Sequence, residues 1–266
     1  MRRRKAQQSN PNTIARWVHE GRGQGEGEEY RPWLTVRDFS SRGLCHRIRS
    51  WKCGKRVLQL FSKLEYEVAL LLDWLDDVTV YYEQYPLHTR EETTEIAHSL
   101  GIRPALEPPA VGEPIVMTSD FLVLKAGKRE VFSVKPAASI SRRALEKFLV
   151  ERSYWEKRDT MCRLLTDEQL PRTLIASIRQ IHGYYFLQKF DFLTPDVVQS
   201  AEAVVRRALE RGSTMAAAAE QVDAVLGVKR GSGLVVLKHL LARKVLPLDP
   251  LRALNFNGPL PLLCNV

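Results

Sequence analysis

Cysteine is scarce in this chain of 266 residues, and the few that occur are scattered. Cys45, Cys53, Cys162 and Cys264 are too few and too far apart for a disulfide scaffold. The amino end carries basic residues but lacks the apolar run of a signal peptide. No apolar stretch reaches the roughly 18 residues that a membrane-spanning helix needs. We therefore expect a soluble protein of a reducing cytoplasm.

Two ligand-binding patterns are incomplete. Cys45, His46 and Cys53 do not form a CxxC pair, and no second pair follows, so a zinc site is not expected there. Glycines alternate through the stretch 21–27, but no Lys-Ser/Thr follows them and no apolar strand precedes them. The glycine-rich stretch is therefore interpreted as a flexible loop rather than a phosphate-binding loop.

Positive charge is in excess. The chain has 40 Lys and Arg against 31 Asp and Glu, a formal net charge of +9, which favours a polyanionic partner. Hydrophobic residues make up 44% of the chain, enough to build the core of one large domain or two ordinary ones.

Hydrophobic periodicity predicts an α/β core. Residues 46–62 read as a basic β-hairpin, and residues 62–75 as an amphipathic helix with Ser62 as N-cap and Glu65 completing a capping box. A strand over 78–87, a hairpin over 115–138, a helix over 141–159 and a short strand over 161–166 follow. The predicted buried face of the last helix consists of Leu145, Phe148, Leu149 and Trp155.

The hairpin over 115–138 places charged residues in the middle of a predicted sheet. If Ala126 and Gly127 form a two-residue turn, the numbers of opposed residues sum to 253. Asp120 then faces Ser133, and Lys135 is its diagonal neighbour about 7 to 8 Å away. Glu130 falls on the opposite face.

A carboxylate beside a lysine has two interpretations. It is either a simple cross-strand ion pair or a site for phosphodiester hydrolysis, in which a carboxylate holds Mg²⁺ and an ammonium orients water or stabilises charge. The spacing alone leaves both open.

Six segments in the first two thirds of the chain are distinctive together: "IARWVHEGRGQGEGEEYRPWLTVRDF", "SKLEYEVALLLDWL", "YYEQYPL", "MTSDFLV", "VKPAAS" and "LEKFLVERSYW". Taken together, they resemble one known family, the TnsA transposon endonucleases. The resemblance covers most of the first two thirds of the chain and implies a restriction-endonuclease-like (PD-(D/E)xK) fold.

The resemblance implies a role for individual residues. Glu65 matches the helix carboxylate of the active site, Asp120 the central metal ligand and Lys135 the catalytic lysine. The family position two before the lysine usually carries glutamine, whereas this chain has Ser133, a shorter and weaker Mg²⁺ ligand. Glu65, Asp120 and the Val134 carbonyl are then the expected ligands of Mg²⁺, for which Mn²⁺ can substitute.

Three further glutamates are alternatives or supports. Glu67 is the second candidate for the helix carboxylate, but it points about 200° away from Glu65 around the helix. Glu83 and Glu151 lie in family-like segments, and we expect structural or supporting roles for them.

The character of the sequence changes near residue 168. Residues 1–167 are expected to form the catalytic domain with an N-terminal arm, and residues 168–266 an all-α, winged-helix-like domain that contacts DNA and partners. A plain helical bundle serving as an interaction surface is the alternative, and the lone His182 and His239 are not expected to be metal ligands. The candidate DNA-binding residues of the second domain are Lys229, Arg230, Lys238, Arg243 and Lys244.

The resemblance implies a Mg²⁺-dependent DNA endonuclease that cleaves the 5′ strand at transposon ends. The resemblance implies as partners transposon-end DNA, a DDE transposase (TnsB-like) and an AAA+ ATPase regulator (TnsC-like). Two alternatives stay open: a noncatalytic DNA-binding or adaptor protein with a decayed site at Ser133, and a stand-alone repair or restriction nuclease.

Overall fold

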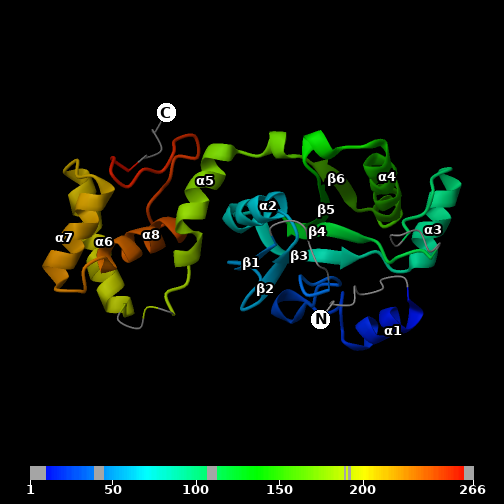
Figure 1. Ribbon diagram of the computed structural model, residues 1–266. Helices are drawn as coiled ribbons and strands as arrows, with labels where there is room; N and C mark the ends of the chain where they lie inside the picture. The colour runs from blue at the N-terminus through cyan, green and yellow to red at the C-terminus, as the bar shows by residue number, and fades with distance from the viewer. Residues whose placement is uncertain (1–9, 39–44, 107–112, 189, 191–192, 261–266) are drawn as a thin grey trace, which may run out of the picture. The chain divides into compact units, whose positions relative to one another are not determined.

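The structure, a computed structural model, describes residues 10–38, 45–106, 113–188, 190 and 193–260 (Figure 1). The chain divides into two compact units, Met1–Leu170 and Pro171–Val266. The sequence places this boundary between residues 167 and 168. The basic residues at the amino end and Cys264 lie outside the described residues.

The first unit is a mixed α/β fold, as the sequence predicts. Its elements are α1 (Pro11–His19), β1 (His46–Arg49), β2 (Val57–Leu60), α2 (Lys63–Trp74), β3 (Val78–Pro86), α3 (Arg90–Ser99), β4 (Thr118–Lys125), β5 (Lys128–Val134), α4 (Arg142–Glu156) and β6 (Met161–Leu165). β1 and β2 pair as the predicted antiparallel hairpin. The larger sheet has the order β3-β4-β5-β6 and is mixed, because only β6 runs parallel to its neighbour β5.

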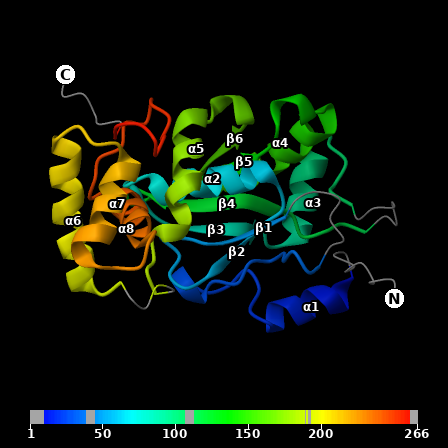
Figure 2. The ribbon, with the colours of Figure 1, turned by 60° about the vertical axis from the view of Figure 1, so that its left-hand side comes forward.

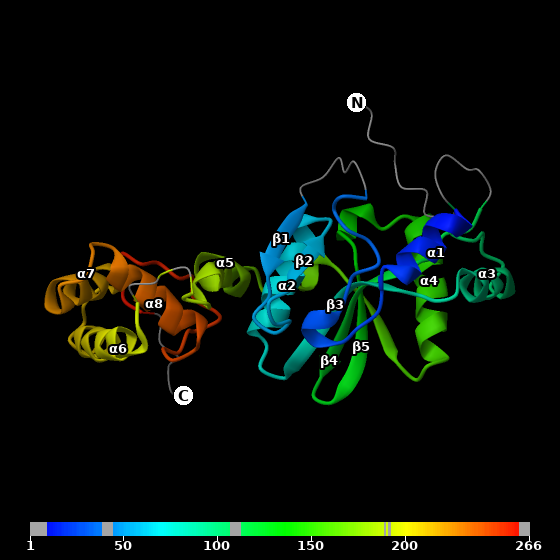
Figure 3. The same cartoon turned by 90° about the horizontal axis from the view of Figure 1, so that it is seen from below.

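The two faces of the larger sheet are covered by different helices. Figure 3 shows α2 and α4 on opposite sides of the sheet. On one face Tyr81 packs against Phe121 and donates a hydrogen bond from its hydroxyl to Asp73 of α2. On the other face Leu122 joins a core cluster with Val150 of α4. Because both faces are buried, the sheet gives the site a rigid base.

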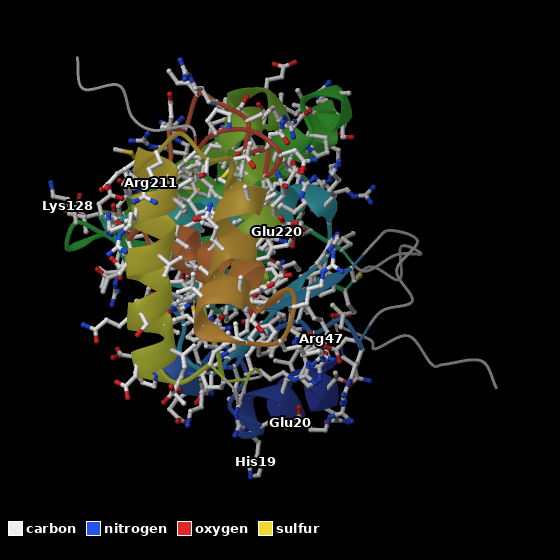
Figure 4. All side chains as sticks on the ribbon, turned by 90° about the vertical axis from the view of Figure 1, so that its left-hand side faces the viewer. His19, Glu20, Arg47, Lys128, Arg211 and Glu220 are labelled. Carbon is white, nitrogen blue, oxygen red and sulfur yellow. The ribbon has the colours of Figure 1, made fainter. Side chains whose placement is uncertain are left out.

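The β4–β5 hairpin confirms the predicted register. Opposed pairs run from Phe121 with Phe132 to Lys125 with Lys128, and their numbers sum to 253. Ala126 and Gly127 form the turn, both with positive φ (47° and 75°), as a two-residue hairpin turn requires. Lys128 projects outward beside this turn (Figure 4). Glu130 lies opposite Val123, in the middle of the pairing.

Helix α2 begins at the predicted N-cap, Ser62, but the predicted capping box is only half formed, because Glu65 accepts from the Phe61 N–H and not from the Ser62 N–H. The hydroxyl of Ser62 accepts a hydrogen bond from the backbone N–H of Glu65 at 3.1 Å. The sequence spacing predicts a buried stripe of Leu64, Val68, Leu71 and Leu75. Leu64 and Val68 are buried, Leu71 and Leu75 are half-buried, and residues on other sides of the helix, including Glu67 and Leu70, are also buried. The helix is therefore buried more completely than the sequence indicates.

Helix α4 is rotated relative to the sequence prediction. Leu145 and Leu149, predicted to be buried, are 42% and 45% exposed, whereas Val150, Glu151 and Tyr154 are buried. The physical reason is that α4 turns a charged stripe inward to line a cleft, and this displaces part of the apolar face. The prediction for Trp155 is confirmed, since this side chain is buried and donates a hydrogen bond to Ser119.

The N-terminal part of the first unit is more ordered than the sequence predicts. Helix α1, which the sequence analysis misses, buries Trp17 against Trp33. The glycine-rich stretch is held by hydrogen bonds, among them one from the backbone N–H of Gly27 to the hydroxyl of Tyr82. A Cβ at Gly23 would lie 2.3 Å from Pro86, so the stretch packs closely on β3. The expectation of a flexible loop is therefore wrong for these residues.

The second unit is helical. Its helices are α5 (Arg172–Ile181), α6 (Pro195–Glu210), α7 (Met215–Leu226) and α8 (Ser232–Ala242), and Figure 2 shows α6, α7 and α8 packed together. Pro195 lies in the first turn of α6, and Gly227 caps α7 with φ 59°.

The predicted wing is not confirmed. Among residues 245–260, which the structure describes, there is no strand. This segment instead lies over the helices, because Leu254 is buried and its backbone N–H donates to Ser177 of α5, while the carbonyl of Phe256 accepts from Ala216 of α7. The segment completes the helical core of the unit.

Candidate active site

The hairpin and helix α2 bring the predicted catalytic residues together. The Lys135 ammonium lies 3.6 Å from the Asp120 carboxylate, and one oxygen of that carboxylate accepts a 2.6 Å hydrogen bond from the Val134 backbone N–H. Pairing of β4 with β5 ends at Phe121 and Phe132, so Asp120 lies just beyond the ladder. Its carboxylate is therefore fixed by the backbone of β5 at the end of the sheet.

Glu65 approaches the same place from the first turn of α2. Its carboxylate accepts hydrogen bonds from Phe61 N–H at 2.8 Å, the Ser62 hydroxyl at 2.9 Å and the Gln84 amide at 3.4 Å. Burial and, secondly, the negative charge of Asp120 raise the pKa of Glu65 to about 7. Hydrogen bonds at the start of α2 thus hold Glu65 in position, and Glu65 is also close enough to Asp120 and Lys135 to interact with their charges.

Gln84 of β3 connects these elements, and sequence reasoning misses it. Besides donating to Glu65, its amide oxygen accepts a hydrogen bond from the Thr118 hydroxyl at 3.2 Å, at the start of β4. Gln84 is buried and has a φ of 50°. The only sequence signal is its place in the segment "YYEQYPL", where a period-two pattern does not distinguish it from any other strand residue.

A cleft of about 410 Å³ opens beside the carboxylate and the lysine. Asp120, Ser133 and Lys135 line it from the sheet, and Lys147 and Glu151 line it from α4. Asp120 holds the pKa of Lys135 above its ordinary value, against the effect of burial. Lys135 is therefore a permanent cation at neutral pH, next to a carboxylate.

Glu151 is part of this site. It is only 4% exposed, and its Oε1 has no hydrogen-bond partner among the described residues. Burial first, and then the charge of Asp120, raise the pKa of Glu151 to about 7, although the hydroxyls of Ser119 and Ser133 act in the opposite direction. Ser133 has a small side chain, and Glu151 of α4 reaches the space beside its hydroxyl.

The other predicted candidates lie elsewhere. Glu67 pairs with Lys63 one turn earlier on α2, at 3.7 Å. Glu83 is fully buried and forms a 2.6 Å ion pair with Arg56, which agrees with a structural role.

The basic residues of the second unit that are predicted to bind DNA differ in their surroundings. Lys229 and Arg230 are exposed in the turn before α8. The Lys238 ammonium lies 4.7 Å from the centre of the Tyr184 ring, and the Arg243 guanidinium 4.5 Å from that of Tyr185, so both cations rest on aromatic faces. Lys244 is half-buried and lies just after α8.

Helix α8 does not have the exposure expected of a recognition helix. Val236, Leu237, Leu240 and Leu241 are buried. His239 contacts the carbonyl oxygen of Tyr184 through Nδ1 at 2.9 Å. DNA binding by this unit therefore stays a prediction that rests mainly on the exposed turn before α8.

The comparisons with known proteins identify the class. Two protein-family models match the chain. The family described as TnsA-like endonuclease N terminal matches residues 75–167, and the family described as TnsA endonuclease C terminal matches residues 169–249. This chain belongs to the family of TnsA-like transposon endonucleases, which confirms the resemblance found in the sequence. Transposon Tn7 transposition protein TnsA of Escherichia coli is 35% identical over 234 residues, which cover 86% of this chain and 82% of the relative.

The matched ranges also locate the site within the family. Asp120, Ser133, Lys135 and Glu151 lie inside the first matched range, whereas Glu65 precedes it. Family membership implies the restriction-endonuclease-like fold for the first unit, and the mixed sheet agrees with it. No helix in the described part of the chain is long and apolar enough to cross a membrane.

Replacing Glu151 with Gln should stabilise the folded protein at alkaline pH. In the folded state Glu151 keeps its proton up to about pH 7, whereas the ordinary pKa of a glutamate is 4.5. Burial of Glu151 therefore costs no stability below pH 4.5. Between pH 4.5 and 7 it lowers the free energy of unfolding increasingly. Glu151→Gln should therefore raise the free energy of unfolding at pH 8 by up to about 3 kcal/mol and flatten its fall between pH 4.5 and 7. Denaturant titrations across this range, with a chelator present, measure both effects.

The matched control is Glu156→Gln, on the same helix but with a side chain that is 53% exposed. This change should alter stability by less than about 0.5 kcal/mol, with no change in its pH dependence. Equal stability of Glu151→Gln and the unmodified protein at pH 8 would show that the buried carboxyl carries no such cost.

Proposed function

We propose that this chain is a divalent-metal-dependent DNA endonuclease that cleaves the 5′ strand at transposon ends during DNA transposition. The single observation that carries the proposal is the convergence of Glu65, Asp120 and Lys135 at one end of the sheet, beside an open cleft. The chain's membership in a family of transposition endonucleases gives this constellation its substrate class, DNA.

The oxygen donors of the site suit Mg²⁺ or Mn²⁺. Mg²⁺ prefers oxygen ligands and keeps several waters, so one or two carboxylates are sufficient. We assign Asp120 and Glu65 as the carboxylate ligands and the Val134 carbonyl as the third donor. Among the described residues, no group of three or more His, Cys, Asp or Glu side chains could hold a metal ion. The unpartnered Oε1 of Glu151 is a further oxygen beside Asp120. When bound, a divalent cation would activate water and neutralise charge on the phosphate.

The residues of the chain have distinct tasks in this proposal. Lys135, held as a cation by Asp120, orients the attacking water or stabilises the charge that develops on the phosphorus oxygens. The backbone N–H of Val134 and the amide of Gln84 fix the two carboxylates in position. In-line attack of water then leaves a 3′-hydroxyl and a 5′-phosphate.

We assign contacts outside the catalytic site to the second unit. Lys229 and Arg230 meet DNA phosphates through charge alone, without reading sequence. A DDE transposase that processes the 3′ strands and an AAA+ ATPase regulator are the proposed protein partners, on the ground that the relative's printed name is that of a transposition protein. The proposed compartment is the bacterial cytoplasm, where the DNA lies.

The test is a strand-resolved cleavage assay. Plasmid DNA carrying the ends of the cognate element is incubated with the full chain, the transposase and the ATPase regulator, with Mg²⁺, with Mn²⁺ or with a chelator. We expect breaks in the 5′ strands that need the chain and either metal, and that bear 3′-hydroxyl ends. Cleavage by the chain alone would instead favour a stand-alone nuclease, and assembly on DNA without any such break would favour a noncatalytic adaptor.

A further inference from the structure

A stripe of charged residues on α4 extends the cleft away from the reacting centre. Arg143, Lys147 and Glu151 are spaced by four residues, so their side chains lie on one face of the helix, about 6 Å apart along its axis. All three line the same cleft as Asp120 and Lys135. Glu151 is at the buried end of this stripe, so Lys147 lies one helical turn farther from Asp120.

Arg143 and Glu151 interact with other residues of the protein. The guanidinium of Arg143 donates to the carbonyl oxygens of Arg103 and Pro104, and it pairs with Glu146 at 3.1 Å. Glu151 is enclosed by the residues of the site. Arg143 therefore serves mainly to join α4 to the segment after α3.

Lys147 differs from both. Its ammonium forms no hydrogen bond or ion pair with any residue that the structure describes. Burial, followed by the positive charges of Arg143 and Lys135, lowers its pKa. The charged groups that act on Lys147 are thus both cations, so it contributes uncompensated positive charge to the cleft.

The remaining wall of the cleft does not supply an anion for Lys147. Val116, Met117 and Phe148 line it with apolar surface. A DNA strand whose cleaved phosphate lies beside Asp120 and Lys135 carries further phosphates on either side of it, and a backbone phosphate is a ligand for which lysine serves as a point charge.

We propose that Lys147 binds the backbone phosphate adjacent to the one that is cleaved, and so sets the register of the DNA strand in the active site. The inference rests on the proposed function for the identity of the strand. It goes beyond that function by assigning a DNA contact to a residue outside the catalytic constellation.

The first test measures the salt dependence of DNA binding. The full chain, without divalent metal, is titrated with a duplex at several salt concentrations, and the slope of the logarithm of the binding constant against the logarithm of salt is compared among variants. Each phosphate contact contributes about 0.9 to this slope. Lys147→Gln should lower the magnitude of the slope by about that amount, and Lys147→Arg should leave it unchanged.

Lys157→Gln is the matched control, because it removes one positive charge just after α4, outside the cleft. It should leave the slope unchanged. An unchanged slope for Lys147→Gln, or an equal loss in both variants, would overturn the inference, since the effect would then be absent or a matter of net charge alone.

A second test locates the phosphate in the cleavage assembly. A methylphosphonate, which is neutral, replaces each phosphate next to the cut in turn. One replacement should slow cleavage by the unmodified chain as much as Lys147→Gln does, and should slow Lys147→Gln no further. Additive losses at every position would overturn the inference. Failure of the proposed function can be told apart from failure of this inference. If the chain shows no metal-dependent cleavage at all, the proposed function fails, but the salt slopes of Lys147→Gln and Lys157→Gln still test the phosphate contact.

Discussion

Replacing Asp120 with Asn should abolish cleavage while leaving the fold intact. Asn keeps the shape of the side chain and can still accept the hydrogen bond from the Val134 N–H, but it removes the negative charge that pairs with Lys135. In the proposed function Asp120 is a ligand of the divalent metal, and loss of such a ligand removes several kcal/mol of transition-state stabilisation, which corresponds to a fall of about 10³-fold or more in the rate. The rate of 5′-strand cleavage, measured in the assembly with the transposase, is the quantity to compare.

Glu130→Gln is the control for this change, since Glu130 lies on the same hairpin but opposite Val123, in the middle of the pairing. It should cleave at a rate within about twofold of the unmodified chain, because Glu130 does not line the cleft and a distant charge acts weakly in salt. Thermal unfolding of both variants shows whether the fold persists. If Asp120→Asn cleaves both strands as well as the unmodified protein does, the site does not perform the reaction.

Loss of the Asp120 charge should also change the titration of its neighbours. Asp120 raises the pKa of both Glu65 and Glu151, and it is the largest influence on the raised pKa of Lys135. In Asp120→Asn all three pKa values should therefore move toward their ordinary values. The four groups form one electrostatic unit, in which Asp120 has the central position.

Local patterns were sufficient to predict the parts of this site that lie close in sequence. The turn at Ala126 and Gly127 fixes the register of the hairpin, and the register places Asp120 beside Lys135. The predicted N-cap, Ser62, likewise fixes Glu65 at the first turn of α2. Each of these arrangements depends on hydrogen bonds between residues only a few positions apart, or across a single turn.

The contribution of α4 could not be predicted in the same way. Its apolar residues indicate a buried face that includes Leu145 and Leu149, but the structure exposes both and turns Lys147 and Glu151 toward the cleft. The rotation of a helix depends on what it packs against, and a functional site opposes simple hydrophobic patterning because it needs charge in a buried place. Spacing of four residues between Lys147 and Glu151 was the available signal, and it is common on any helix.

The helices α1 and α3 were missed for a related reason. Both are short, and α3 is rich in charged and polar residues, so its pattern resembles a loop. Tertiary contacts stabilise them: Trp17 of α1 packs against Trp33, and Ile96 of α3 joins the core with Tyr154 of α4. Isolated helices of this length are marginal in water, so such contacts decide whether they form.

Replacing Arg56 with Met should destabilise the first unit by about 3 to 5 kcal/mol, which is the cost of leaving a buried carboxylate without its partner. Arg56 and Glu83 have side chains that are 7% and 0% exposed, and they form a 2.6 Å ion pair between the β1–β2 hairpin and β3. Arg56 also donates to the carbonyl of Tyr81 at 3.1 Å, and Glu83 accepts from the Gln59 N–H at 3.1 Å. Denaturant unfolding at neutral pH measures the loss.

A double variant separates the ion pair from simple packing. Burial already raises the pKa of Glu83, and Arg56 lowers it, so Arg56→Met leaves a carboxyl that must either stay charged without a partner or take up a proton. Adding Glu83→Leu removes that charge, and the double variant should be more stable than Arg56→Met alone. The double variant can instead lose more free energy of unfolding than Arg56→Met and Glu83→Leu lose together. In that case the hydrogen bonds to Tyr81 and Gln59 are what hold the hairpin on β3. Glu83 is next to Gln84, and the Gln84 amide donates a hydrogen bond to Glu65. If Arg56→Met displaces the hairpin, cleavage should therefore also be slower. The double variant, if it regains stability, should regain part of the cleavage rate.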